Sequence, residues 1–286
     1  MILRFSLGGR EFQTDTGLPH DISIPVRFDG PRPCAFGLPG AAAHVFESDG
    51  FVGDTRRGGS CNCYVLTLIA HGNGTHTECV GHIALDRISI LAVLRRFLMP
   101  AALVTVSPAP ASTLREDEAF TEPTDRVIGA QALEEAIEAL GDLPPDFYRA
   151  LVIRTAPNPP LKASTSYSQT NPPYFSRAGI WSLRRWGTEH LLCDLPSVDR
   201  EQDGGRLAAH RIFWGRDRDS QPAATASGGT ITELVYVADD VPDGPYLLDL
   251  QVAPIDLDAA PSRPVLYSLV ELGAARPPPG ARGDHP

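Results

Sequence analysis

Three of the eight histidines in this chain lie within twelve residues, together with one carboxylate and three glycines. Imidazole and carboxylate are the usual protein ligands of zinc and manganese, and a glycine-rich turn lets several such side chains approach one ion. The other interpretation is that these histidines are polar turn residues or hydrogen-bonded core groups. Spacing alone predicts a metal site and leaves that second interpretation open. The candidate residues are His71, His76, Glu78 and His82.

The local backbone decides whether these side chains can converge. In an extended strand, side chains alternate between faces, so His76 and Glu78 would lie on the same face and could reach one ion. The preceding apolar, β-branched run Tyr64–Ile69 predicts a largely buried strand. Functional side chains are common in loops that a rigid scaffold positions, and a strand followed by a histidine-rich turn fits that arrangement.

Cysteine and lysine chemistry offers weaker alternatives. The five cysteines are odd in number and lack Cys-x-x-Cys spacing, which predicts free thiols. The Cys61-Asn62-Cys63 segment could bind a soft metal, but packing at a strand start is the commoner role. Cys79 could act as a nucleophile if a neighbouring histidine lowered its pKa, an interpretation that ranks below the metal site. Lys162 is the only lysine, hence the only candidate for Schiff-base chemistry.

Composition narrows the classes of protein. The formal charge of −10 is spread along the chain, and no lysine or arginine tract is present, which argues against a nucleic-acid partner. The 42% apolar content is ordinary for a globular protein, and the 26 glycines and 27 prolines predict many turns. The expected partner is a small-molecule substrate.

The chain is predicted to form one domain over residues 1–274, followed by a disordered tail over residues 275–286 that is rich in proline and lacks an apolar anchor. The longest apolar candidate for a membrane span, residues 88–106, is broken by two arginines and a proline. The first residues lack the features of a signal peptide. We therefore expect a cytoplasmic protein without a membrane anchor.

Strand and helix signals alternate along the middle of the chain. Ala102–Val106 and Leu151–Thr155 are apolar and β-branched, and between them Ala130–Leu140 has the apolar spacing of an amphipathic helix, with Gly141 as its stop. Residues 156–178 mix proline, serine and asparagine and predict a long surface loop. The pattern favours a mixed α/β fold.

Further polar candidates occur in the second half of the chain. Asp194, Ser197 and Asp199 lie at a predicted transition from strand to turn, and His210 follows them. Glu233 lies among apolar residues, so its carboxylate is either on the solvent face of a strand or held by a cation.

Together these motifs resemble the cyclase family of metal-dependent hydrolases, which includes bacterial kynurenine formamidase and isatin hydrolase. The family pattern His-x-Gly-Thr-His-x-Asp-x-x-x-His is followed from Gly74 to His82. Downstream, the family has Asp-x-x-Ser-x-Asp, a histidine and a glutamate, so the resemblance spans roughly residues 60–240. The matching downstream residues are Asp194, Ser197, Asp199, His210 and Glu233.

The resemblance implies a role for each matched residue. His76 and Glu78 would bind a first metal ion, Glu78, His210 and Glu233 would bind a second, and His82 would shuttle protons. The implied cofactor is a divalent metal, zinc or manganese, as one or two ions. The resemblance also implies a β-rich, barrel-like core with peripheral helices, and usually a homodimer.

The sequence departs from the family pattern at two positions. Glu78 stands where the family has aspartate, and its carboxylate is one methylene further from the backbone. Strict alignment places the family's first histidine on Gly72, so His71 can serve as a metal ligand only if the turn formed by Gly72, Asn73 and Gly74 bulges.

The chemistry that such a site supports is hydrolysis. A bound divalent ion lowers the pKa of its water, so that metal-bound hydroxide can attack an amide carbonyl, and His82 can protonate the leaving amine. The leading prediction is hydrolysis of a small aryl formamide of the N-formylkynurenine type. Cleavage of a cyclic amide or lactone comes next, and a non-catalytic metal-binding or ligand-binding protein is the alternative of a different class.

Overall fold

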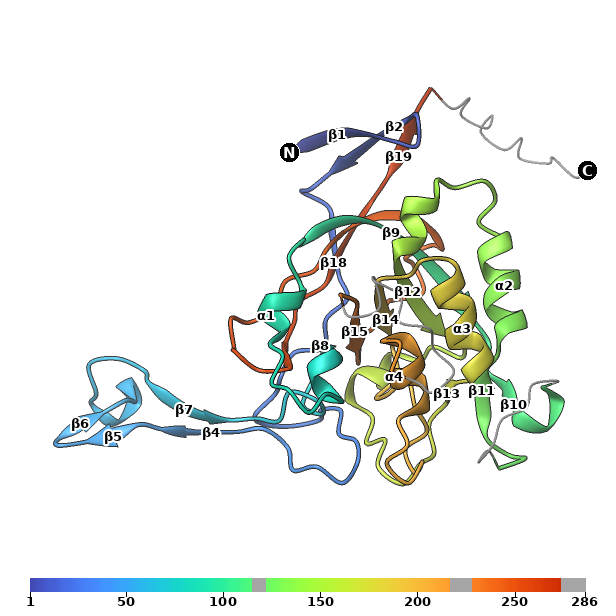
Figure 1. Cartoon of the computed structure of the whole chain (residues 1–286). Helices are drawn as coiled ribbons and strands as arrows, with labels where there is room; N and C mark the ends of the chain where they lie inside the picture. The colour runs from blue at the N-terminus through green and yellow to red at the C-terminus, as the bar shows by residue number, and fades with distance from the viewer. Residues whose placement is uncertain (115–121, 217–227, 274–286) are drawn as a thin grey trace, which may run out of the picture.

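A nine-stranded mixed sheet, curled into a half barrel, forms the centre of the molecule (Figure 1). The computed structural model describes residues 1–114, 122–216 and 228–273. In spatial order the strands are β17 (Ala259–Pro261), β8 (His76–Cys79), β15 (Thr230–Glu233), β14 (His190–Cys193), β12 (Ala150–Thr155), β9 (Leu98–Val106), β16 (Gly244–Asp249), β18 (Val265–Ser268) and β3 (Pro19–Asp21).

The four middle strands β15, β14, β12 and β9 run parallel, and antiparallel strands flank them on both sides. Every residue of β12 and β14 is buried. Strands covered on both faces are expected to read as continuous apolar runs, as Leu151–Ile153 does. The two predicted strands in this region are confirmed, and β9 begins four residues earlier than its apolar core indicated.

Three helices cover one face of the sheet, namely α2 (Ala130–Glu138), α3 (Arg177–Arg185) and α4 (Ala208–Phe213) (Figure 1). Leu133, Ile180 and Ile212 from these helices join Leu151 and Ile153 of the sheet in one buried cluster. The predicted helix at 130–140 is confirmed as α2. Gly141 follows it with a φ of +72°, the left-handed conformation that ends many helices.

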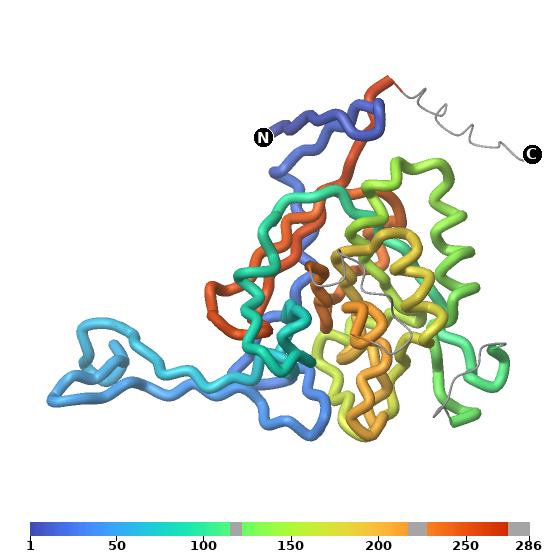
Figure 2. The backbone as a smooth tube through the Cα atoms, in the orientation of Figure 1, coloured from blue at the N-terminus to red at the C-terminus, as the bar shows by residue number. Residues whose placement is uncertain are grey.

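A two-stranded hairpin extends away from the body of the molecule, as Figures 1 and 2 show. This arm comprises residues 42–67, with β4 (Ala42–Val45) paired only to β7 (Tyr64–Thr67), and β5 (Glu47–Ser48) and β6 (Phe51–Val52) at its tip. All four residues of β7 are exposed. The prediction of a largely buried strand over Tyr64–Ile69 was therefore wrong, because β propensity indicates a strand but not what covers it.

Short elements complete the chain. Part of the predicted loop at 156–178 is regular and buried, because the strand β13 (Tyr174–Phe175) lies within it and α3 begins at Arg177 after the capping residue Ser176. The remaining elements are β1 (Ile2–Leu7), β2 (Arg10–Asp15), β10 (Ala109–Pro110), β11 (Arg126–Ile128), β13 (Tyr174–Phe175), β19 (Val270–Leu272), α1 (Ile90–Val93), and the 3-10 turns η1 (Thr55–Arg57), η2 (Val80–His82), η3 (Ala111–Thr113), η4 (Pro145–Arg149) and η5 (Pro160–Ser164).

The predicted mixed α/β fold with a β-rich, barrel-like core and peripheral helices is confirmed. The tail at 275–286 lies outside the described residues. Among the helices that the structure describes, none combines the length and the apolar character needed to span a membrane.

Candidate metal centre

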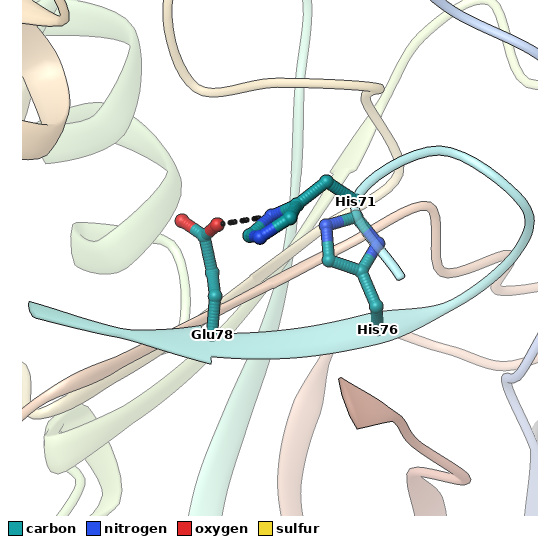
Figure 3. A group of neighbouring side chains, drawn as sticks. All are labelled: His71, His76 and Glu78. Atoms are coloured by element: carbon teal, nitrogen blue, oxygen red, sulfur yellow. Dashed lines mark ion pairs between the residues drawn. The ribbon is translucent and has the colours of Figure 1, made fainter. Parts of the chain in front are cut away.

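The site begins on β8, a strand that is hydrogen-bonded on both sides. His76 and Glu78 lie two residues apart on this strand, and their side chains point from the same face, as predicted from strand alternation (Figure 3). Both residues are almost completely buried, with 0% and 1% exposure. A buried carboxylate between two neighbouring strands requires a cationic partner or hydrogen bonds.

The glycine-rich turn before β8 brings His71 into the site. Asn73 closes this turn, because its side-chain oxygen accepts the Ile69 amide at 2.7 Å and its backbone amide donates back to the Ile69 carbonyl at 3.2 Å. Gly74 has a φ of +152°, and a Cβ atom there would lie 2.9 Å from the Ile24 carbonyl oxygen. This turn places His71 Nδ1 within 2.9 Å of Glu78 Oε2.

His82 follows β8 on the turn η2 and closes the exposed side of the cluster. Its Nδ1 atom lies 3.8 Å from Glu78 Oε2, and its ring centroid is 4.2 Å from that of His71. Both imidazoles are about one quarter exposed, in contrast to the buried side chains on β8. His82 is therefore accessible from solvent while it faces the buried carboxylate.

His210 reaches the same carboxylate from helix α4. Its Nε2 atom is 2.9 Å from Glu78 Oε1, and its Nδ1 donates to Asp199 Oδ2 at 2.6 Å. Asp199 also accepts the backbone amides of Ala209 and His210, which satisfies donors at the start of α4. One carboxylate therefore fixes both the helix and the orientation of the ring.

Glu233 completes the centre at the end of β15. The antiparallel pairing of β15 with β8 places Glu233 directly opposite His76, and Glu233 Oε2 lies 3.4 Å from His76 Nε2. Its other oxygen accepts the Val198 amide at 2.9 Å and lies 3.7 Å from His210 Nε2. Leu234 has a φ of +56°, so the extended backbone ends immediately after this carboxylate.

The structure thus brings together every residue predicted for the site. The residues that converge are His71, His76, Glu78, His82, His210 and Glu233.

The downstream motif has a structural role as well. Asp194 is fully buried, accepts both the amide and the hydroxyl of Thr155, and pairs with Lys162 Nζ at 2.8 Å. Ser197 accepts the Asp199 amide at 3.1 Å. These contacts hold the carboxyl ends of β12 and β14 and the loop that positions Asp199. Lys162, the only candidate for Schiff-base chemistry, is engaged in this network.

Four buried atoms in the described part of the centre have no hydrogen-bond partner: His76 Nε2, both carboxylate oxygens of Glu78 and His210 Nε2. These atoms lie at ion-pair distances from one another, 2.9 Å from His210 Nε2 to Glu78 Oε1 and 3.4 Å from His76 Nε2 to Glu233 Oε2, but none of them has a partner with hydrogen-bond geometry. Buried polar atoms without partners are rare in folded proteins. Imidazole nitrogens and carboxylate oxygens are ligands of zinc and manganese, so the donor set fits a divalent metal.

The electrostatics of the cluster depend on Glu78. Burial acts to raise the pKa of Glu78, but the positive charge of His210 and the histidine contacts outweigh it, and the pKa lies well below its usual range. Burial opposes charge on His71, yet Glu78 and Asp258 raise its pKa to about 9. The pKa of His210 is likewise raised, by Glu78 and Asp199. Burial and the two neighbouring imidazoles instead lower the pKa of His82.

These shifts predict how the stability of the metal-free protein depends on pH. The His71 pKa rises from 6.5 to about 9 on folding, so its stabilising contribution is complete below pH 6.5 and is lost as the pH rises through 9. We expect the free energy of unfolding to fall over this interval by up to about 3 kcal/mol. Urea unfolding in the presence of a chelator at several pH values measures it. His71→Gln should make this fall smaller, while the contribution of His210 remains, and a wild-type profile that is flat over the interval would contradict the assignment.

The thiol alternative is not supported by the position of Cys79. This side chain is completely buried, and burial raises the pKa of its thiol to about 11. A thiol with that pKa is protonated at neutral pH and is a poor nucleophile. Cys61 and Cys63 are exposed on the arm, away from the histidine cluster.

One acidic residue near the cluster was missed in the sequence. Asp258 Oδ2 lies 2.9 Å from His71 Nε2 and 3.5 Å from His82 Nδ1. An isolated aspartate in a loop carries no motif that distinguishes it from a solvated one, and only the pairing of β17 with β8 brings it here.

Comparison with known proteins places the chain in a family. The model of the family named Cyclase matches residues 20–200, more than half of the chain. The chain belongs to the Cyclase family. The matched region contains the cluster on and around β8 and ends before His210 and Glu233. No curated protein sequence matches the chain.

Solved structures show the same fold for this cyclase-family protein. Isatin hydrolase A from Labrenzia aggregata, bound to benzyl benzoate, has a TM-score of 0.59 at 13% identity, covering 87% of this chain and 93% of that one. Isatin hydrolase A from Ralstonia solanacearum has a TM-score of 0.58 at 13% identity, covering 88% of this chain and 92% of that one. A potential metal-dependent hydrolase with cyclase activity has a TM-score of 0.57 at 15% identity, covering 87% of this chain and 97% of that one.

Proposed function

We propose that this cyclase-family protein is a metal-dependent hydrolase of a small aryl formamide or a related amide, of the N-formylkynurenine type. The observation that carries the proposal is the convergence of unpartnered, buried imidazole and carboxylate atoms beside the accessible ring of His82. The ligands in this proposal are His71, His76, Glu78, His210 and Glu233, and they would hold zinc or manganese as one or two ions.

Glu78 occupies the centre of the proposed ligand set. Its two oxygens face different histidines, Oε2 toward His71 and Oε1 toward His210, each at 2.9 Å. A carboxylate whose two oxygens face different histidines would help to hold one ion or two, and the metal content per chain gives the number. When bound, a divalent metal supplies a Lewis acid and lowers the pKa of water.

In this proposal His82 transfers the proton. Its Nδ1 faces Glu78 and Asp258, which leaves Nε2 for exchange with water or substrate. Its lowered pKa leaves the ring neutral at pH 7, so it can accept a proton at Nε2 and return it to the leaving amine. An aniline-type leaving group would need such a donor, since the amine must be protonated as the C–N bond breaks.

A second candidate substrate is a cyclic amide or lactone. The similarity in fold to isatin hydrolases supports this candidate, and the same residues could act on a ring carbonyl. The protein is stripped of metal, reloaded with Zn²⁺ or Mn²⁺, and assayed with N-formylkynurenine and with isatin. We expect metal-dependent hydrolysis of one of them. Metal binding without hydrolysis of either would refute both and favour a non-catalytic binding protein.

We also propose that the protein is a homodimer in which the arm contacts a second copy. Phe46, Tyr64, Val65 and Leu66 are large apolar residues on the arm, and each is 38 to 53% exposed. A two-stranded hairpin alone is marginally stable in water, and closed two-fold symmetry would cover both arms at once. The cytoplasmic location stays a prediction from the sequence.

Light scattering after size-exclusion chromatography tests the dimer. The wild type is expected at twice the chain mass of 30.8 kDa, and Leu66→Glu at a lower average mass, because a charge replaces an apolar contact. Leu18→Glu is the matched control, since Leu18 is exposed but lies off the arm. A monomeric wild type, or a Leu66→Glu variant as dimeric as the control, would contradict the proposal.

A further inference from the structure

Asp258 is fixed beside the metal centre by the backbone of its own segment. It immediately precedes β17, where Ala259 pairs with Glu78 of β8. The Asp258 carbonyl accepts the Cys79 amide at 3.0 Å. Gly81 leaves room for it, because a Cβ atom at Gly81 would lie 3.0 Å from Asp258 Cβ. The side chain of Asp258 is thus held against the segment that carries the histidines.

A single oxygen of Asp258 touches two of those histidines. Its Oδ2 atom is hydrogen-bonded to His71 Nε2 at 2.9 Å and lies 3.5 Å from His82 Nδ1. The opposite nitrogen of His71, Nδ1, faces Glu78. The contact with Asp258 therefore determines which nitrogen of His71 points into the centre, and it holds the ring beside that of His82.

The contact completes a pattern shared by the three imidazoles that are proposed as metal ligands, His71, His76 and His210. The outer nitrogen of His76 donates to the Gly74 carbonyl at 3.1 Å, and that of His210 donates to Asp199 at 2.6 Å. An outer hydrogen bond of this kind fixes the tautomer and the orientation of a ligating ring.

His71 needs such an anchor more than the other two. It lies on a glycine-flanked turn, and its side chain is 28% exposed, whereas those of His76 and His210 are at most 3% exposed and are held by packing. If the ring were free to rotate, metal binding would be weaker, because the side chain would lose conformational entropy when it became ordered.

We propose that Asp258 is a positioning residue that directs His71 Nδ1 into the metal centre and holds His71 and His82 side by side. This role rests on the proposed metal-dependent function. It concerns the affinity and geometry of the centre, so it can be measured without any substrate.

Titration of the metal-free protein with Zn²⁺ or Mn²⁺ against a competing chelator tests the proposal. Asp258→Ala is expected to weaken binding by about 10- to 100-fold, the usual effect of losing an outer partner of a ligand. Asp258→Asn keeps an oxygen that accepts the His71 Nε2 proton and is expected to retain affinity within about threefold. Asp256→Ala, an exposed aspartate two residues earlier, is the matched control and should bind like the wild type.

Nitrogen-15 NMR of the histidine rings supplies a second readout. The wild type and Asp258→Asn should hold His71 with its proton on Nε2 when metal is bound, and Asp258→Ala should not. Wild-type affinity in Asp258→Ala would overturn the proposal. Equal loss in Asp258→Asn and Asp258→Ala would also overturn it, because it would make the carboxylate itself a ligand. Should Asp258→Ala fail to fold, Asp258→Asn and the ring spectrum still decide the matter.

The two proposals fail in different ways. A wild type that binds metal but hydrolyses neither substrate refutes the proposed function and leaves the affinity comparison valid. A wild type that hydrolyses substrate while Asp258→Ala binds metal normally refutes only the role of Asp258.

Discussion

Replacing Glu78 with glutamine is expected to lower the affinity for Zn²⁺ or Mn²⁺ by more than about 100-fold and to remove hydrolysis with it. Loss of an outer partner alone typically costs about 10- to 100-fold. Glu78 contacts His71 and His210 directly, and its charge acts with that of Asp258 on His71 and with that of Asp199 on His210 to raise the pKa of each histidine. Glutamine has the same shape but lacks that charge and offers one acceptor oxygen in place of two.

Metal content after dialysis and chelator competition measure this effect. Glu138→Gln, an exposed change on helix α2, serves as the control and should leave metal binding unchanged. Glu78→Asp tests the length of the side chain, because an aspartate is one methylene shorter and cannot keep both 2.9 Å contacts from the same backbone position. We expect it to bind metal more weakly than the wild type. Undiminished binding by Glu78→Gln would exclude Glu78 as a ligand.

Replacing His82 with glutamine is expected to lower kcat by about 10²- to 10⁴-fold while the metal stays bound. The reason is its position, because the ring is partly exposed and its Nδ1 is 3.8 Å from Glu78 Oε2. Burial also lowers the pKa of His82, which favours the neutral ring. Removing the proton carrier should thus slow turnover without emptying the centre. Parallel measurement of kcat and bound metal separates the two effects.

Cys79→Ser is the control for the effect of His82→Gln on turnover. Cys79 is a close neighbour of His82 in sequence, but its thiol is buried and protonated, so the serine variant should keep chelator-sensitive activity. Loss of metal in His82→Gln would make His82 a ligand instead of a proton carrier. Unchanged kcat in that variant would remove it from the mechanism.

Local patterns predicted the elements whose environment matches their composition. The strand at 151–155 was predicted because a continuous apolar run indicates burial on both faces. The helix at 130–140 was predicted because apolar residues at helical spacing indicate burial on one face. The same logic failed for Tyr64–Thr67, whose apolar residues lie on an exposed arm. Composition reports what a segment can bury, and the fold decides what is available to cover it.

At the site, spacing on one strand was sufficient for His76 and Glu78, because their common face follows from the two-residue period of extended backbone. His71 required the turn closed by Asn73, which no local pattern specifies. Glu233 was ambiguous in the sequence between a solvated strand face and a cation site. Its burial follows from the pairing of β15 with β8.

The sequence by itself determined the donor atoms of this protein, because residue type sets whether a side chain can bind a divalent ion, and short-range period sets which neighbours share a face. The tertiary structure decided which of those atoms meet. Glu78 lies close to His210 and Asp258 lies close to His71 through strand pairing and helix packing between segments more than a hundred residues apart. Such contacts depend on the summed burial of the whole sheet, which no local stretch of residues encodes.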